Sequence, residues 1–257
     1  MLSTTRRSFL RNTVQLGALA ALGGCATTAS PPVAPTAFTP PPPMLPTDPL
    51  FLQDPSLDTV LEGTPDYAML YGPVFTEPFP VNGIDLTRIE PQFLRQRVRY
   101  FSDMEPGSIV VDPAAHFLYF IQPDNWAVRY GVGTGKAGFS WSGLATIKFK
   151  REWPDWYPVQ EYIDRNPRVV AQLSQLQSGM GIPGGSRNPI GARGLYLWQG
   201  DVDTLYRIHG TLEPYSIGRN VSSGCIRMIN QDAMDLFKRV QVGATVKVTG
   251  DAVVASL

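Results

Sequence analysis

The sequence has little of what a metal site, a nucleic-acid surface or a membrane span requires. Its 257 residues include two cysteines and two histidines, and 22 Lys and Arg balance 22 Asp and Glu. A four-ligand zinc site would use nearly all of those cysteines and histidines, so we expect no structural metal. We also expect no cofactor. Nucleic-acid-binding proteins need a basic surface that contacts the phosphate backbone, so the absence of net charge argues against a nucleic-acid partner. No run of about 18 apolar residues occurs, so we expect no spanning helix in the mature protein.

The first 24 residues are typical of an export signal. Arg6 and Arg7 form a twin-arginine pair, no acidic residue precedes Asp48, and a mildly apolar run covers residues 13–22. The run ends in Leu-Gly-Gly before Cys25, which resembles a lipobox. We therefore expect export to the periplasm or cell envelope, with lipidation of Cys25 as a membrane anchor. The alternative is an ordinary signal-peptidase cut that discards Cys25.

The next two segments have different characters. Residues 25–55 are rich in proline, with nine prolines between Pro31 and Pro49, and predict an extended tether. Residues 56–105 are mixed, with one helix-like stretch over Glu90–Phe101. No function follows from this segment, which we expect to pack against the domain after it.

From Pro106 to Gly250 the pattern is mainly β. The strand candidates are Ser108–Asp112, Phe117–Gln122, Ala127–Gly133, Ala145–Phe149, Leu195–Trp198, Thr204–His209 and Ala244–Thr249. Two helical patterns interrupt them, Val159–Gln177 and Asn230–Val240, the second with Asn230 as its expected N-cap. The sequence predicts a mainly β domain, a sandwich or barrel-like sheet with helical insertions.

One constellation carries chemistry. His209 stands 16 residues before Cys225, a glycine lies beside each, and Arg227 follows the cysteine. A neighbouring imidazole can take the proton of a thiol and lower its pKa. Gly224 lets backbone amides approach an acyl oxygen, as an oxyanion hole requires. Arg227 can hold a carboxylate or support the loop.

These residues, His-Gly-Thr at 209–211 and Ser-x-Gly-Cys-Ile-Arg at 222–227, resemble the L,D-transpeptidase (YkuD-type) catalytic domain over about 106–250. The resemblance implies Cys225 as nucleophile, His209 as general base and then acid, and an oxyanion hole around Gly224 and Cys225. It implies a YkuD-like fold and a peptidoglycan stem tetrapeptide as substrate, from which D-Ala leaves before a second stem's amine takes the acyl group. It also implies meso-diaminopimelate at stem position three and inactivation by carbapenems.

The remaining candidates have weaker signals. Gly210 is grouped with the substrate or oxyanion residues, and Ser222 and Ser223 are expected to shape the loop and donate hydrogen bonds. For Arg227, loop support and substrate contact stay equally open. His116 lies in a predicted hairpin without a motif around it, so we expect no catalytic role.

A glycine pattern and an aromatic segment need separate interpretation. Residues 133–138 satisfy G-x-G-x-x-G, but a turn-like stretch follows them instead of a helix, so we expect no nucleotide partner. Trp153, Trp156 and Tyr157 precede the helical pattern at 159–177. They could line a peptide groove under a lid, or fill the core beneath an insertion.

Three alternatives remain beside a transpeptidase. Water in place of the amine would make the protein an L,D-carboxypeptidase or a cross-link hydrolase. Papain-like enzymes, sortases and caspases fit the order or the spacing of His209 and Cys225 poorly. A non-catalytic wall-binding lipoprotein would be expected to lack one of the two residues.

Overall fold

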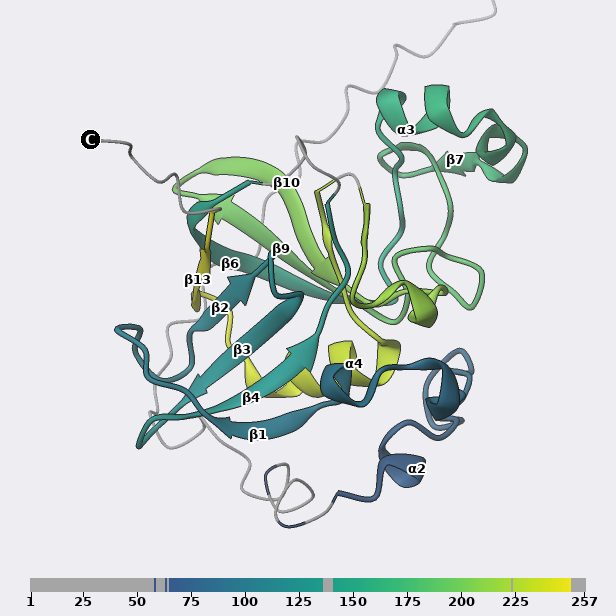
Figure 1. Cartoon of the computed structure of the whole chain (residues 1–257). Helices are drawn as coiled ribbons and strands as arrows, with labels where there is room; N and C mark the ends of the chain where they lie inside the picture. The colour runs from purple at the N-terminus through teal and green to yellow at the C-terminus, as the bar shows by residue number, and fades with distance from the viewer. Residues whose placement is uncertain (1–57, 59–62, 64, 136–140, 223, 251–257) are drawn as a thin grey trace, which may run out of the picture. The chain divides into compact units, whose positions relative to one another are not determined.

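The largest element is a nine-stranded mixed sheet, shown in Figure 1. The structure is a computed structural model and describes residues 58, 63, 65–135, 141–222 and 224–250. In sheet order the strands are β1 (Gln96–Arg99), β4 (Trp126–Gly131), β3 (Phe117–Gln122), β2 (Ile109–Asp112), β13 (Thr245–Val248), β6 (Gly143–Glu152), β9 (Arg193–Gln199), β10 (Val202–His209) and β12 (Ile226–Arg227). The β2–β13 and β10–β12 pairs are parallel and the others antiparallel.

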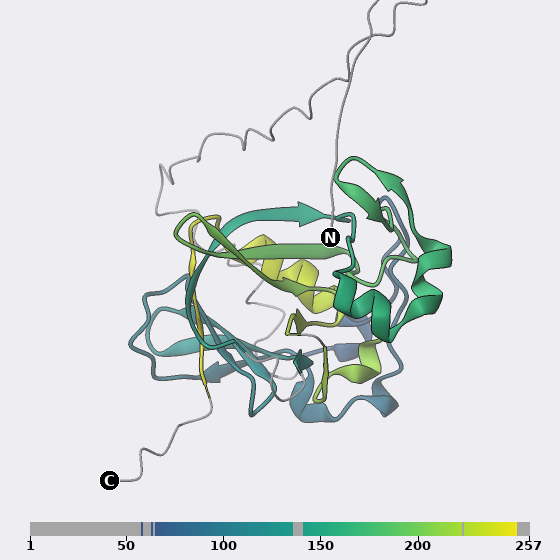
Figure 2. The ribbon, with the colours of Figure 1, turned by 90° about the horizontal axis from the view of Figure 1, so that it is seen from above.

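Short elements decorate this sheet. Two small sheets pair β5 (Thr134–Gly135) with β11 (Asn220–Ser222), and β7 (Ser174–Leu176) with β8 (Gly179–Gly181). The α-helices are α2 (Tyr67–Leu70), α3 (Gln160–Arg165) and α4 (Asn230–Arg239). The 3₁₀ turns are η2 (Leu86–Arg88), η3 (Pro91–Phe93), η4 (Pro167–Gln172) and η5 (Pro214–Ser216). In both views the segment with α3 and β7 stands outside the large sheet (Figures 1 and 2).

The main core lies between the sheet and α4. Fully buried Leu195, Leu197 and Ile208 from β9 and β10 belong to the same apolar cluster as Ala233 and Leu236 of α4. Alternating strand residues supply one side of this cluster, and the apolar stripe of α4 supplies the other. The predicted mainly β fold with helical insertions is confirmed, and each of the seven predicted strands overlaps an observed one.

One helix prediction holds only in part, and another is wrong. The pattern at 159–177 breaks into α3, η4 and strand β7. Pro167 explains the break, because a proline disfavours helical geometry in the residue before it, and Asn166 has φ −135° and ψ 61°. The stretch 90–101 forms only η3 and then strand β1, which extends the sheet beside β4.

The segment before residue 106 packs against α4 through buried polar groups, as expected. The Tyr71 hydroxyl donates to Asp232 at 3.0 Å and accepts from the Arg95 N–H at 2.7 Å. The Arg95 guanidinium pairs with Asp235 at 2.5 Å and lies 3.6 Å from Asp232. Burial raises the pKa of Asp232 to about 7, although Arg95 and Tyr71 oppose the shift. This segment therefore supplies the guanidinium and hydroxyl groups that partner the buried carboxylates of α4.

The export signal, Cys25 and the proline-rich tether lie outside the described residues. In the described part of the chain, no helix is long and apolar enough to cross a membrane.

Candidate active site

The parallel pairing of β10 with β12 brings the two parts of the motif together at the sheet edge. His209 pairs with Arg227 and Ile208 with Ile226, and the Met228 N–H donates to the His209 carbonyl at 2.8 Å. Both isoleucines belong to the core cluster, so His209 and Arg227 fall on the opposite face. Cys225 directly precedes β12, two residues before Arg227, which places it at the same edge as His209.

The Cys225 thiol lies against a β-bulge in β10. The register of β10 against β9 shifts between Asp203 and Arg207, and Leu205 has φ 62°, a left-handed conformation that is unusual for this residue type. The Cys225 Sγ donates to the Leu205 carbonyl at 4.0 Å, a long contact, and the Arg207 backbone also bonds to it. Asp203 supports the bulge by accepting from the Leu205 N–H at 2.8 Å and by pairing with Arg207 at 2.7 Å. The thiol is thus held against a strained turn of β10.

The electrostatics keep both groups neutral. Burial raises the pKa of the Cys225 thiol above its ordinary value, against lowering effects of the Arg207 backbone and of the Arg207 and Arg227 charges. Burial, together with the charges of Arg227 and Arg207, lowers the pKa of His209 to about 4, although bonds to the backbone of Gly210 and Ile190 oppose the shift. This arrangement favours a neutral thiol and a neutral imidazole, whereas the sequence analysis expected the imidazole to take the thiol proton and lower the thiol pKa.

The hydrogen bond of His209 fixes its tautomer. Its Nδ1 lies 2.5 Å from the Gly210 carbonyl, which only an Nδ1–H can donate to, so Nε2 keeps the lone pair. No hydrogen bond joins His209 to Cys225 among the residues that the structure describes. The imidazole is therefore oriented by the backbone rather than by the thiol.

The loop before Cys225 is tied by one hydroxyl. Ser222 Oγ donates to the Cys225 carbonyl at 2.5 Å and accepts from the Gly224 N–H at 3.1 Å. Gly224 has φ 118°, a conformation that favours glycine. Because Ser222 already uses the Gly224 N–H, the Cys225 N–H is the donor of this turn without a partner in the described part of the chain. Ser223 lies outside the described residues.

Asn230 has a role that its expected N-cap position does not suggest. The helix N-cap is Ile229, and the Asn230 side chain accepts from the Ala192 N–H at 3.0 Å and donates to the Thr211 carbonyl at 2.9 Å. A Cβ at Gly210 would lie 2.1 Å from the Asn230 Oδ1. Gly210 is thus required by the close approach of Asn230, which holds the loop that bonds His209. The only sequence signal for this role was the position of Asn230 five residues after Cys225.

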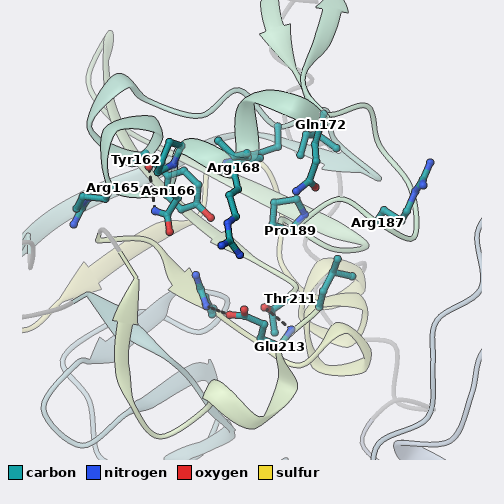
Figure 3. A pocket seen from close by; sticks show the side chains of 15 residues that line it. Tyr162, Arg165, Asn166, Arg168, Gln172, Arg187, Pro189, Thr211 and Glu213 are labelled. Carbon is teal, nitrogen blue, oxygen red and sulfur yellow. Dashed lines mark hydrogen bonds and ion pairs between the residues drawn. The ribbon is translucent and has the colours of Figure 1, made fainter.

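A cavity of about 510 Å³ lies beside this edge. Tyr162, Arg168 and Gln172 line one side, and Thr211 and Glu213 line the other (Figure 3). Trp156 and Arg227 are also among the lining residues. Trp156 packs edge-on against Tyr162 with ring centroids 4.9 Å apart. Trp153, in contrast, is held outside the cavity by a hydrogen bond from its Nε1 to Glu77 at 3.0 Å. The aromatic segment therefore both lines a groove and anchors the insertion, with different residues for each.

The other candidates occupy distinct places. Arg227 forms an ion pair with Glu213 at 2.7 Å and also lines the cavity. His116 Nε2 lies 2.9 Å from Asn220 Oδ1, at the start of β11. Gly133 exchanges backbone hydrogen bonds with Arg227, so the start of the G-x-G-x-x-G pattern belongs to a β connection, and 136–138 lie outside the described residues. No group of three or more potential metal ligands occurs within the described ranges.

A mainly β domain with a cysteine and a histidine at one sheet edge is the arrangement of a cysteine acyl-transfer domain. A model of the YkuD family, described as the L,D-transpeptidase catalytic domain, matches residues 106–248, which is more than half of the chain. The chain therefore belongs to the YkuD L,D-transpeptidase catalytic-domain family.

Two curated relatives from Escherichia coli K12 agree with this assignment. The chain is 33% identical over 178 residues to the probable L,D-transpeptidase ErfK/SrfK, covering 66% of this chain and 50% of that protein. It is 29% identical over 154 residues to the probable L,D-transpeptidase YbiS, covering 58% and 46%. The chain thus spans about half the length of the curated relatives that it matches.

Solved structures give a weaker likeness. A crystal structure of a probable carnitine operon oxidoreductase caia from Brucella melitensis is 44% identical, covers 65% of this chain and 96% of its own, and has a TM-score of 0.41. An L,D-transpeptidase from Mycobacterium smegmatis is 20% identical, covers 55% and 58%, and has a TM-score of 0.40. Both TM-scores are too low to bear on activity.

Proposed function

We propose that this protein is a peptidoglycan L,D-transpeptidase with Cys225 as nucleophile and His209 as general base and acid. The observation that carries the proposal is the pairing of β10 with β12, which sets both residues at one edge beside a cavity. Family membership supports the reaction type, and the stem peptide is the substrate that the family implies.

In the first half-reaction, Cys225 Sγ attacks the carbonyl carbon between the third stem residue and D-Ala. Because the pKa values favour a neutral thiol and a neutral imidazole, the thiol proton moves to His209 Nε2 as the C–S bond forms. The Cys225 N–H is the donor offered to the oxyanion. The C–N bond then breaks, His209 returns the proton to the leaving amine, and D-Ala departs from a thioester.

In the second half-reaction, an amine of another stem attacks the thioester carbonyl. His209 takes a proton from this amine, the C–S bond breaks, and the proton returns to Sγ. The product is a 3→3 cross-link and a regenerated thiol. Arg227 lines the cavity, and we expect the cavity to hold the peptide during both steps.

The alternative with water in the second half-reaction shares the same thioester. A product analysis separates the two outcomes: the purified protein is incubated with tetrapeptide muropeptides, and the products are read by mass spectrometry. Cross-linked dimers are expected. Tripeptide without dimers would make the protein a hydrolase, and unchanged tetrapeptide would contradict both.

We also propose that the protein acts in the cell envelope, anchored by a lipid on Cys25. The unopposed arginines, the apolar run and the Leu-Gly-Gly before Cys25 support this proposal. Mass spectrometry of the mature protein is expected to find an acylated N-terminal Cys25. A mature terminus beyond residue 25 would contradict the anchor.

A further inference from the structure

The cavity beside the motif is lined by an unusual set of charges. Among the 15 lining residues are four arginines, Arg165, Arg168, Arg187 and Arg227, and one acidic residue, Glu213. Three of the arginines come from the insertion between β6 and β9, and only Arg227 comes from the motif. The insertion therefore supplies the positive charge that the motif itself does not account for.

The single acid does not neutralise these arginines. Glu213 pairs with Arg227 at 2.7 Å. Arg168 and Arg187 are exposed, and neither forms an ion pair with any residue in the described ranges. Figure 3 shows Arg168 extending from η4 toward Glu213, with Arg165 and Arg187 at opposite margins. Arg168 thus presents a guanidinium group to the cavity, and Arg187 supplies a second one at its margin.

The shape of the site favours a small anion carried on a peptide. A volume of about 510 Å³ is in the range of pockets for small ligands, and Trp156 and Tyr162 add apolar walls. Guanidinium groups bind carboxylates through paired hydrogen bonds. The cavity reaches the catalytic edge through Thr211 and Arg227, close to where a peptide bound to Cys225 would pass.

We propose that this arginine-lined cavity binds the free carboxylates of the stem peptide and selects stems with carboxylates over stems with carboxamides. The proposal rests on the proposed function, because the peptide is the proposed donor. Arg168 and Arg187 are its specificity-determining residues. A carboxamide has the same shape but no negative charge, so it would lose the charge-assisted hydrogen bonds.

The test compares two stem tetrapeptides that differ only in whether their side-chain carboxylates are free or are carboxamides. Thioester formation on Cys225 is followed by intact-protein mass spectrometry, and kcat/KM is determined for each donor. We expect the wild-type protein to prefer the free acid by about tenfold or more, mainly through KM. The Arg168→Gln, Arg187→Gln double variant is expected to lose this preference.

The control is Arg99→Gln, which removes one positive charge from β1 at the opposite edge of the sheet and should keep the preference. Equal use of both donors by the wild-type protein, or an unchanged preference in the double variant, would overturn the proposal.

A binding measurement separates this proposal from the proposed function. Calorimetry with the full-length Cys225→Ala protein measures the affinity for each peptide without any reaction. In one outcome no variant forms a thioester, yet the free acid still binds more tightly in a way that depends on Arg168 and Arg187. That outcome would contradict the proposed transpeptidase function and support the carboxylate-binding cavity. If thioesters form but the affinities are equal, the cavity proposal fails alone.

Discussion

At the scale of single residues, the site depends on hydrogen bonds that a motif does not reveal. The motif at 209–211 and 222–227 located Cys225 and His209, and the register of β10 with β12 brings them to one edge. It did not predict that Ser222 occupies the Gly224 N–H, because that bond follows from the turn geometry. Nor did it predict the bulge at Leu205, since a left-handed leucine has no local sequence signal.

We expect the hydrogen bonds of the Ser222 hydroxyl to stabilise the protein. Ser222→Ala removes the acceptor of the Gly224 N–H and the donor to the Cys225 carbonyl. The free energy of unfolding is expected to fall by about 1–3 kcal/mol, with a lower kcat, because the turn that carries the nucleophile loosens. Urea unfolding measures it. Ser216→Ala is the matched control, since Ser216 Oγ makes one exposed bond to the Glu213 carbonyl. Equal effects of the two variants would argue against a role for Ser222.

We expect the reactivity of Cys225 to depend on pH in a way that reports its protonation state. Burial raises the pKa of Cys225, so the thiolate fraction at pH 7 is smaller than for a free cysteine. Alkylation by iodoacetamide, a neutral reagent, should accelerate across pH 6–9, with a midpoint above that of an ordinary cysteine thiol. His209→Gln should leave this profile nearly unchanged, because a histidine with a pKa of about 4 carries no charge there. A plateau below pH 7 would indicate a preformed thiolate–imidazolium pair.

At the scale of elements, the start of α4 connects the two halves of the site. Asn230 bonds Ala192 and Thr211 and leaves no room for a side chain at Gly210. The sequence placed the helix correctly but assigned Asn230 to its cap, because local patterns do not reveal partners that lie 19 and 38 residues away.

The contact with Gly210 can be tested by a double-mutant cycle. Gly210→Ala is expected to lower the free energy of unfolding by about 1–3 kcal/mol through overpacking against Asn230. In the Asn230→Ala background the same change should cost much less, since the clashing oxygen is gone. Thermal or urea unfolding of the four proteins measures the coupling. Additive costs would show that Gly210 and Asn230 act independently.

We expect the insertion between β6 and β9 to contribute to substrate binding. Trp156→Ala removes an aromatic wall of the cavity and is expected to raise KM about tenfold, with little change in kcat. Tyr157→Ala is the control, because Tyr157 belongs to the same segment but is not among the cavity-lining residues. A loss of stability with unchanged kinetics would instead make Trp156 part of the packing under the insertion.

At the scale of the whole molecule, the segment before residue 106 is part of the folded domain, although the family model begins there. Its strand β1 pairs with β4, and its Arg95 and Tyr71 contact the buried Asp232. The composition of this segment predicted that it packs against the domain but not which residues it contacts. These contacts join buried polar groups that are far apart in the sequence, so no local pattern reveals them.

Truncation tests this integration. A fragment of residues 106–257 would lack Arg95 and Tyr71, which partner Asp232 and Asp235. Loss of one partner of a buried ion pair costs about 3–5 kcal/mol. We expect this fragment to fail to fold, while residues 58–257 fold and melt cooperatively. Circular dichroism and thermal melting of both fragments measure the difference. Equal stability would show that the N-terminal segment is dispensable.

The nucleophilic role of Cys225 is tested by the mass of the intact protein after mixing with a stem tetrapeptide. We expect an adduct equal to the tetrapeptide less D-Ala, which maps to Cys225, is absent in Cys225→Ala and forms far more slowly in His209→Gln. An adduct at another residue, or one that forms equally fast without the imidazole, would contradict it.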